Sequence, residues 1–69
     1  MTRAVAMGKL TRLYENCRQN ASDTVEFWEK SLDAFQRISE EANNHKVTVA
    51  AVDYFCMLQN EFCEALKGA

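Results

Sequence analysis

Apolar residues recur along this chain with the spacing of helices. Leu10, Leu13, Tyr14 and Cys17 follow the i, i+3, i+4, i+7 pattern of one helix face. A second stripe comprises Trp28, Leu32, Phe35 and Ile38, and a third comprises Val52, Phe55, Cys56, Phe62, Cys63 and Leu66. The chain has no proline and two glycines, so few residues interrupt these patterns. We therefore predict an all-α domain, a small bundle of three helices near residues 4–19, 23–42 and 48–67.

Polar residues at two junctions predict where the helices separate. Residues 19–24 are rich in side chains that compete with a helix by hydrogen-bonding their own backbone. Asp23 and Glu26 have the spacing of a capping box, so the second helix is expected to begin at Asp23. One long helix through this junction is the alternative, since no proline or glycine interrupts it. Residues 43–46 predict a turn, with Thr48 as the N-cap of the third helix.

The two glycines lie near the ends of the expected helices. Gly8 costs about 1 kcal/mol relative to alanine in a helix, so residues 1–8 are expected to fray. Gly68 is expected to end the third helix. The segment Val47–Val52 has a strand-like composition, but no second strand pattern is present to pair with it.

The third helix is unusual because it is apolar on most of its circumference. One flank carries Val52, Phe55, Phe62 and Leu66, and the other carries Ala51, Tyr54, Leu58 and Ala65. Two short helices of the same chain can cover one flank. The other most simply meets a second copy, because two-fold homodimers are the commonest assemblies. We therefore predict a self-association or partner interface, with a homodimer or higher oligomer as its product, at Trp28, Leu32, Phe35, Val52, Tyr54, Phe55, Leu58, Phe62 and Leu66.

The size of the chain also favours oligomerisation. A fold of about 60 residues buries only roughly 60% of its unfolded surface and tends to need a disulfide, a metal or a partner subunit. Cys56 and Cys63 would lie about 10 Å apart along one helix, beyond the roughly 7 Å limit for a disulfide. We expect these residues and Cys17 to be free thiols that act as small core hydrophobes. Such cysteines are typical of a reducing cytosol, so the expected location is cytoplasmic, with no membrane segment.

Charge is distributed unevenly along the chain. The first 20 residues carry Arg3, Lys9, Arg12 and Arg18 against one acid, whereas the remainder carries nine acids against four bases. The four basic residues are candidates for contact with an anionic partner. We favour a basic helix resting on an acidic neighbour, because an acidic body repels phosphate. In a helix-turn-helix, residues 47–50 would enter the major groove, and they offer almost no base-reading side chains.

Motifs of catalytic or metal chemistry are not recognisable in the chain. His45 is the single histidine and the cysteines are widely spaced, which does not match the paired ligands of zinc sites. The cysteines follow apolar stripes, whereas a reactive thiolate needs an electropositive pocket. We therefore predict a protein that is not an enzyme and has no catalytic, metal-binding or cofactor-binding residues.

Taken whole, the chain resembles the short helical proteins encoded in the exo–xis early region of lambdoid bacteriophages. The resemblance covers most of the chain, from Met7-Gly8-Lys9-Leu10-Thr11-Arg12-Leu13-Tyr14 to Phe62-Cys63-Glu64-Ala65-Leu66. It implies a small regulator of a temperate phage that favours lytic development over lysogeny, through host or phage protein partners in the bacterial cytoplasm. A DNA-binding transcriptional regulator is the alternative, and a helical co-chaperone of a bacterial secretion system is the third reading.

Overall fold

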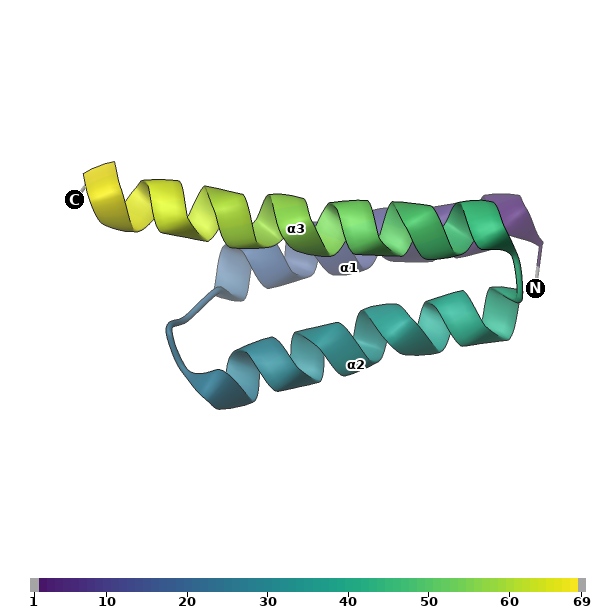
Figure 1. The fold of residues 1–69 in the computed structure, drawn as a ribbon, viewed down its shortest axis with the longest axis horizontal. Coiled ribbons are helices and arrows are strands. Elements are labelled where there is room, and N and C mark those ends of the chain that lie inside the picture. The colour runs from purple at the N-terminus through teal and green to yellow at the C-terminus, as the bar shows by residue number, and fades with distance from the viewer. Residues whose placement is uncertain (1, 69) are drawn as a thin grey trace.

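Three helices lie side by side in the computed structural model, which describes residues 2–68 (Figure 1). They are α1 (Arg3–Asn20), α2 (Val25–Ala42) and α3 (His45–Gly68). Consecutive helices run in opposite directions, and each helix packs against both of the others. The structure confirms the all-α fold of three helices. It also shows a break between α1 and α2, so the two are not one continuous helix.

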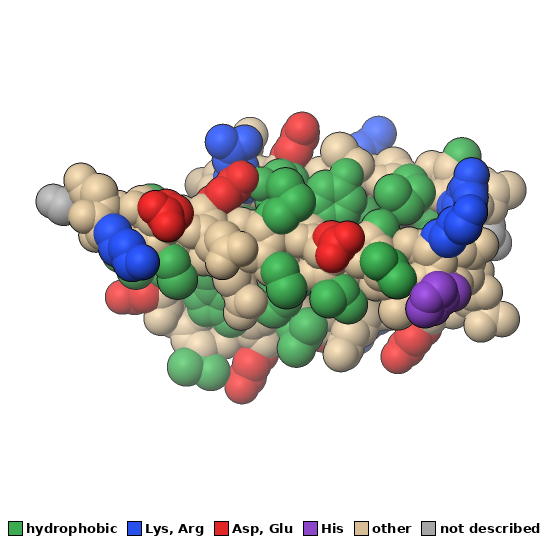
Figure 2. Space-filling view, turned by 45° about the horizontal axis from the view of Figure 1, so that its top comes forward, with side chains coloured by type: hydrophobic (Ala, Val, Ile, Leu, Met, Phe, Trp, Pro, Cys, Tyr) green, Lys and Arg blue, Asp and Glu red, His purple; other side chains and the backbone are tan. Residues whose placement is uncertain are grey.

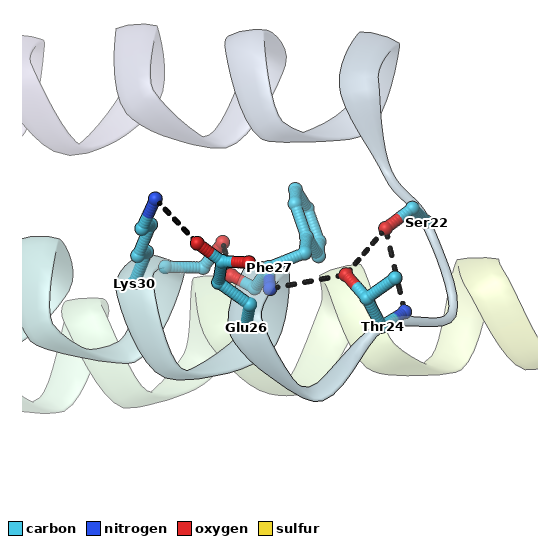
Figure 3. A network of polar contacts seen from close by, with 6 residues as sticks. Ser22, Thr24, Glu26, Phe27 and Lys30 are labelled. Atoms are coloured by element: carbon cyan, nitrogen blue, oxygen red, sulfur yellow. Dashed lines mark hydrogen bonds and ion pairs between the residues drawn. The ribbon is translucent and has the colours of Figure 1, made fainter.

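The N-cap of α2 is Thr24, one residue after the expected cap at Asp23. The Thr24 hydroxyl oxygen accepts a hydrogen bond from the Phe27 backbone N–H at 3.2 Å, and it lies 2.9 Å from the Ser22 hydroxyl (Figure 3). With Thr24 as the cap, Phe27 occupies the position that a capping box reserves for Glu or Gln. Glu26 instead pairs with Lys30 at 3.0 Å along the exposed side of the helix.

Replacing Thr24 by alanine is expected to lower the free energy of unfolding by about 1 kcal/mol, within a range of roughly 0.5–2 kcal/mol for lost N-caps. The matched control is Asp23→Ala at the neighbouring exposed position, which should change stability by less than about 0.5 kcal/mol. Urea denaturation followed by far-UV circular dichroism measures both. A larger loss in Asp23→Ala than in Thr24→Ala would contradict the observed cap.

The second junction is shorter than expected, so α3 begins at His45 rather than at residue 48. Asn43 adopts the left-handed conformation (φ 47°, ψ 48°), which asparagine tolerates, and its N–H donates to the Ser39 carbonyl at 3.0 Å. The side-chain oxygen of Asn44 accepts a hydrogen bond from the Lys46 N–H at 2.9 Å. Thr48 therefore lies inside α3, and its hydroxyl is 2.7 Å from that of Ser39, linking α3 to α2.

The start of α1 has its own N-cap. The Thr2 hydroxyl accepts a hydrogen bond from the Val5 N–H at 3.2 Å, and Ala6 is fully buried. Residues 3–8 are helical, and Ala6 packs into the core. The fraying expected over residues 1–8 stays a prediction. Met1 lies outside the described residues.

The core is formed by a few side chains from each helix. Its buried apolar members are Ala6, Leu10, Tyr14, Cys17, Phe35, Val47, Ala51 and Leu58. Ser31 is also buried, and its hydroxyl donates a hydrogen bond to the Phe27 carbonyl at 2.8 Å. Because α3 has 24 residues against 18 in each of the other helices, its last turns extend beyond them (Figure 1).

Candidate interaction surface

Three of the expected interface residues are used inside the bundle. Phe35 and Leu58 are 2% and 1% exposed and belong to the core. Tyr54 packs towards α1, where its ring centroid lies 5.2 Å from that of Tyr14 and its hydroxyl oxygen 2.9 Å from that of Thr11. These side chains therefore hold the three helices of one chain together: Phe35 and Leu58 are buried, and Tyr54 is half-buried.

A half-buried aromatic cluster joins α2 to α3. Trp28 meets Phe55 and Phe62 edge to face, with ring centroids 6.0 and 5.5 Å apart, and Phe35 meets Phe55 at 6.0 Å. Such pairs contribute about 0.5–1.5 kcal/mol each beyond their buried area. The cluster explains why α2 and α3 stay together, and it leaves part of the Trp28, Phe55 and Phe62 rings at the surface.

The remaining expected residues, Leu32, Val52 and Leu66, are exposed by 41%, 57% and 59%. Leu32 on α2 and Val52 on α3 line opposite walls of a groove of about 250 Å³. The full lining of this groove is Leu32, Phe35, Gln36, Ser39, Thr48, Ala51, Val52 and Phe55, which includes no charged side chain. We call the exposed Leu32, Gln36 and Val52, together with the half-buried Phe55, the α2–α3 face.

Hydrophobic side chains occupy much of the middle of the side shown in Figure 2, with an acidic side chain among them and basic side chains towards the edges. Exposed apolar patches on a small protein usually mark a site of contact with another molecule. Of the interface predicted from the sequence, only the part on the outer side of α2 and α3 is exposed. The two apolar flanks of α3 are not exposed as a whole.

The four basic residues of the first helix do not form one continuous stripe. Arg18 pairs with Glu61 of α3, with Nε and Oε2 3.2 Å apart. Lys9 and Arg12 line a shallow groove beside Ile38 of α2. Arg3 lies at the start of α1. The structure therefore brings Lys9 and Arg12 together and uses Arg18 in an ion pair within the bundle.

A polar contact between Tyr14 and Glu61 lies at the α1–α3 boundary and was missed by sequence reasoning. The Tyr14 hydroxyl donates a hydrogen bond to Glu61 Oε1, while Oε2 is buried, faces Arg18 and accepts no hydrogen bond from the described residues. The hydrogen bond to the carboxylate, followed by burial and the carboxylate's charge, raises the pKa of Tyr14 above its ordinary value. The sequence feature that could have indicated this contact is Glu61, because it lies three residues after Leu58 and therefore on the same side of the helix.

The raised pKa of Tyr14 predicts a loss of stability in alkali. The protonated hydroxyl is bound more favourably in the folded state, so its contribution is complete below about pH 10 and is lost as the pH rises through the folded-state pKa. We expect the urea midpoint of the native protein to fall as the pH rises above about 10. Tyr14→Phe should reduce this fall, whereas the control Tyr54→Phe should reduce it less. An equal fall in native protein and Tyr14→Phe would contradict the prediction.

The cysteines divide between the core and the surface. Cys17 is buried, with its sulfur 3.6 Å from the Ser31 hydroxyl, as expected of a core thiol. Cys56 and Cys63 are exposed, which corrects the expectation that they belong to the core. The cause is the position of α3, which turns Leu58 inwards and its neighbours at 56 and 63 outwards.

Over residues 2–68, no group of three His, Cys, Asp or Glu side chains is placed to hold a metal ion. Within the same residues, no helix combines the length and apolar character needed to cross a bilayer. The chain matches no protein-family model, and no curated protein or solved structure is significantly similar to it.

Proposed function

We propose that this protein is a non-enzymatic regulator that acts by protein–protein contact through its α2–α3 face. The observation that carries the proposal is the uncharged groove whose walls are formed by Leu32 and Val52, both well exposed. An apolar groove between two neighbouring helices is the kind of surface that binds an amphipathic helix of a partner protein. The adjoining half-buried Trp28 adds a residue type that often dominates binding energy.

The resemblance to early-region proteins of lambdoid phages supports a particular biological process for this contact. It supports a role in the choice between lytic and lysogenic development, with a host or phage protein as the partner in the bacterial cytoplasm. Binding to nucleic acid has weaker support. Arg18 pairs with Glu61, and the other basic side chains of α1 do not form a continuous stripe with Arg18.

The test measures phage development in bacteria that produce the protein. With a temperate lambdoid phage, production of the native chain is expected to lower the fraction of infected cells that become lysogens. Leu32→Glu and Val52→Glu should abolish this effect, because each places a charge in the α2–α3 face. The matched control is Val5→Glu on α1, where the side chain is similarly exposed at 52%. Equal activity of native protein and both face variants would refute the proposal.

A further inference from the structure

A second helical seam runs along the exposed side of α3. The core side of this helix follows the spacing of Val47, Ala51, Tyr54 and Leu58, which contact α1 and α2. The opposite side repeats the same alternation of three and four residues at Val49, Val52, Cys56, Gln59, Cys63 and Leu66, and all six are exposed. We call these six residues the outer seam. A repeat of seven residues with apolar first and fourth positions is the pattern by which two helices coil around each other.

We infer that the outer seam binds the outer seam of a second copy of this chain, so that the two α3 helices form a parallel coiled coil. The inference rests on the proposed function and names the partner that covers the α2–α3 face and its continuation along α3. Val52 belongs to both the face and the seam, so one partner molecule covers them together.

The observations favour a second copy as the occupant. None of the six seam positions carries a charge, so two identical seams meet without repulsion even though the chain has a net charge of −2. The seam is about 25 Å long, and with the neighbouring groove the contact is about 20 Å wide, the width of two helices. Such a contact buries on the order of 1,000 Å² in total, which is near the lower limit for a specific interface.

The flanking residues select the parallel orientation. In a centred antiparallel pair, Lys46 of one copy would lie beside Lys67 of the other, whereas in a parallel pair Asp53 lies beside Thr48 and Lys67 beside Phe62. A parallel pair also places the two Gln59 side chains opposite each other. Each amide has a donor and an acceptor, so the two can hydrogen-bond mutually and fix the register.

Light scattering after gel filtration gives the first test, on the full chain at a series of concentrations. The native protein is expected to form dimers at micromolar concentrations. Val52→Glu should raise the dissociation constant at least about tenfold, because two carboxylates would be buried opposite each other. Val5→Glu, with the same change of charge, should leave the constant unchanged, and circular dichroism checks that both variants fold. A native protein that stays monomeric at high micromolar concentration overturns the inference.

The exposed cysteines then report the orientation. In the parallel pair Cys56 faces Cys56 of the second copy, and Cys63 faces Cys63. Diamide joins facing thiols into one disulfide by taking two electrons and two protons from them. We expect covalent dimers in both Cys63→Ala, which keeps Cys56, and Cys56→Ala, which keeps Cys63. In the centred antiparallel pair Cys56 would face Gln59 and Cys63 would face Val52, so a lack of covalent dimers in both variants would overturn the parallel arrangement.

The oligomeric state and the effect on lysogeny test the dimer and the proposed function separately. If the protein is monomeric and Val52→Glu still abolishes the effect on lysogeny, the α2–α3 face binds a different protein and the inference fails alone. If the protein dimerises as described and Val52→Glu keeps full activity, the dimer stands and the proposed function fails.

Discussion

Replacing Phe35 by alanine is expected to lower the free energy of unfolding by about 3–5 kcal/mol. Phe35 is the largest fully buried side chain, and its ring packs against Phe55 of α3. The substitution leaves a cavity where α2 meets the other helices. A chain of this length has a total stability of roughly 3–10 kcal/mol, so the loss takes much of it. Urea denaturation, followed by far-UV circular dichroism, measures the change.

The control for Phe35→Ala is Val25→Ala on the same helix. Val25 is 72% exposed, so its replacement should change stability by less than about 0.5 kcal/mol. If the two variants lost similar amounts, the assignment of Phe35 to the core would be incorrect.

Leu58→Ala is expected to lower the free energy of unfolding by about 2–5 kcal/mol. The side chain is 1% exposed in the centre of α3, between the two other helices. Met57→Ala provides an adjacent control, since Met57 is 47% exposed and its removal leaves no internal cavity. Chemical denaturation measures both variants, and the loss in free energy of unfolding should be several times larger for Leu58→Ala than for Met57→Ala.

The same pair of variants decides whether Leu58 acts within one chain. The sequence placed Leu58 at an interface, whereas the structure buries it in the monomer. A loss of stability within one chain is independent of protein concentration, while a loss at a dimer interface depends on it. A destabilisation by Leu58→Ala that disappears on dilution would support the interface and contradict the core position.

The sequence was informative about the fold because helical periodicity is a local property. Leu10, Tyr14 and Cys17 were expected on one face of a helix, and all three are buried on one side of α1. The two junctions were also marked by polar residues. Their boundaries depended on finer contacts: the Asn44 side chain caps Lys46 and moves the start of α3 back to His45.

The candidate surface was harder to predict, because spacing alone does not show which apolar side of α3 faces inwards. That choice depends on the angle at which α1 and α2 meet α3, and no local pattern encodes it. As a result, Leu58 and Val52 were assigned to the same interface although one is buried and the other exposed. Glu61 is a similar case: its carboxylate is acceptable at a core spacing because Tyr14 and Arg18 lie next to it.

Because the end of α3 projects beyond the core, the backbone amides of this one helix are protected from hydrogen exchange to two different degrees. Around Leu58, opening the backbone hydrogen bonds of α3 requires the three-helix core to come apart. From Cys63 to Gly68 every described side chain is exposed, so these turns can unwind while the core stays intact. Amide protons in one continuous helix therefore exchange by two routes, global unfolding in its middle and local fraying at its end. A second copy bound along α3 would slow exchange at the end by covering these turns, and would also slow it in the middle by stabilising the folded state.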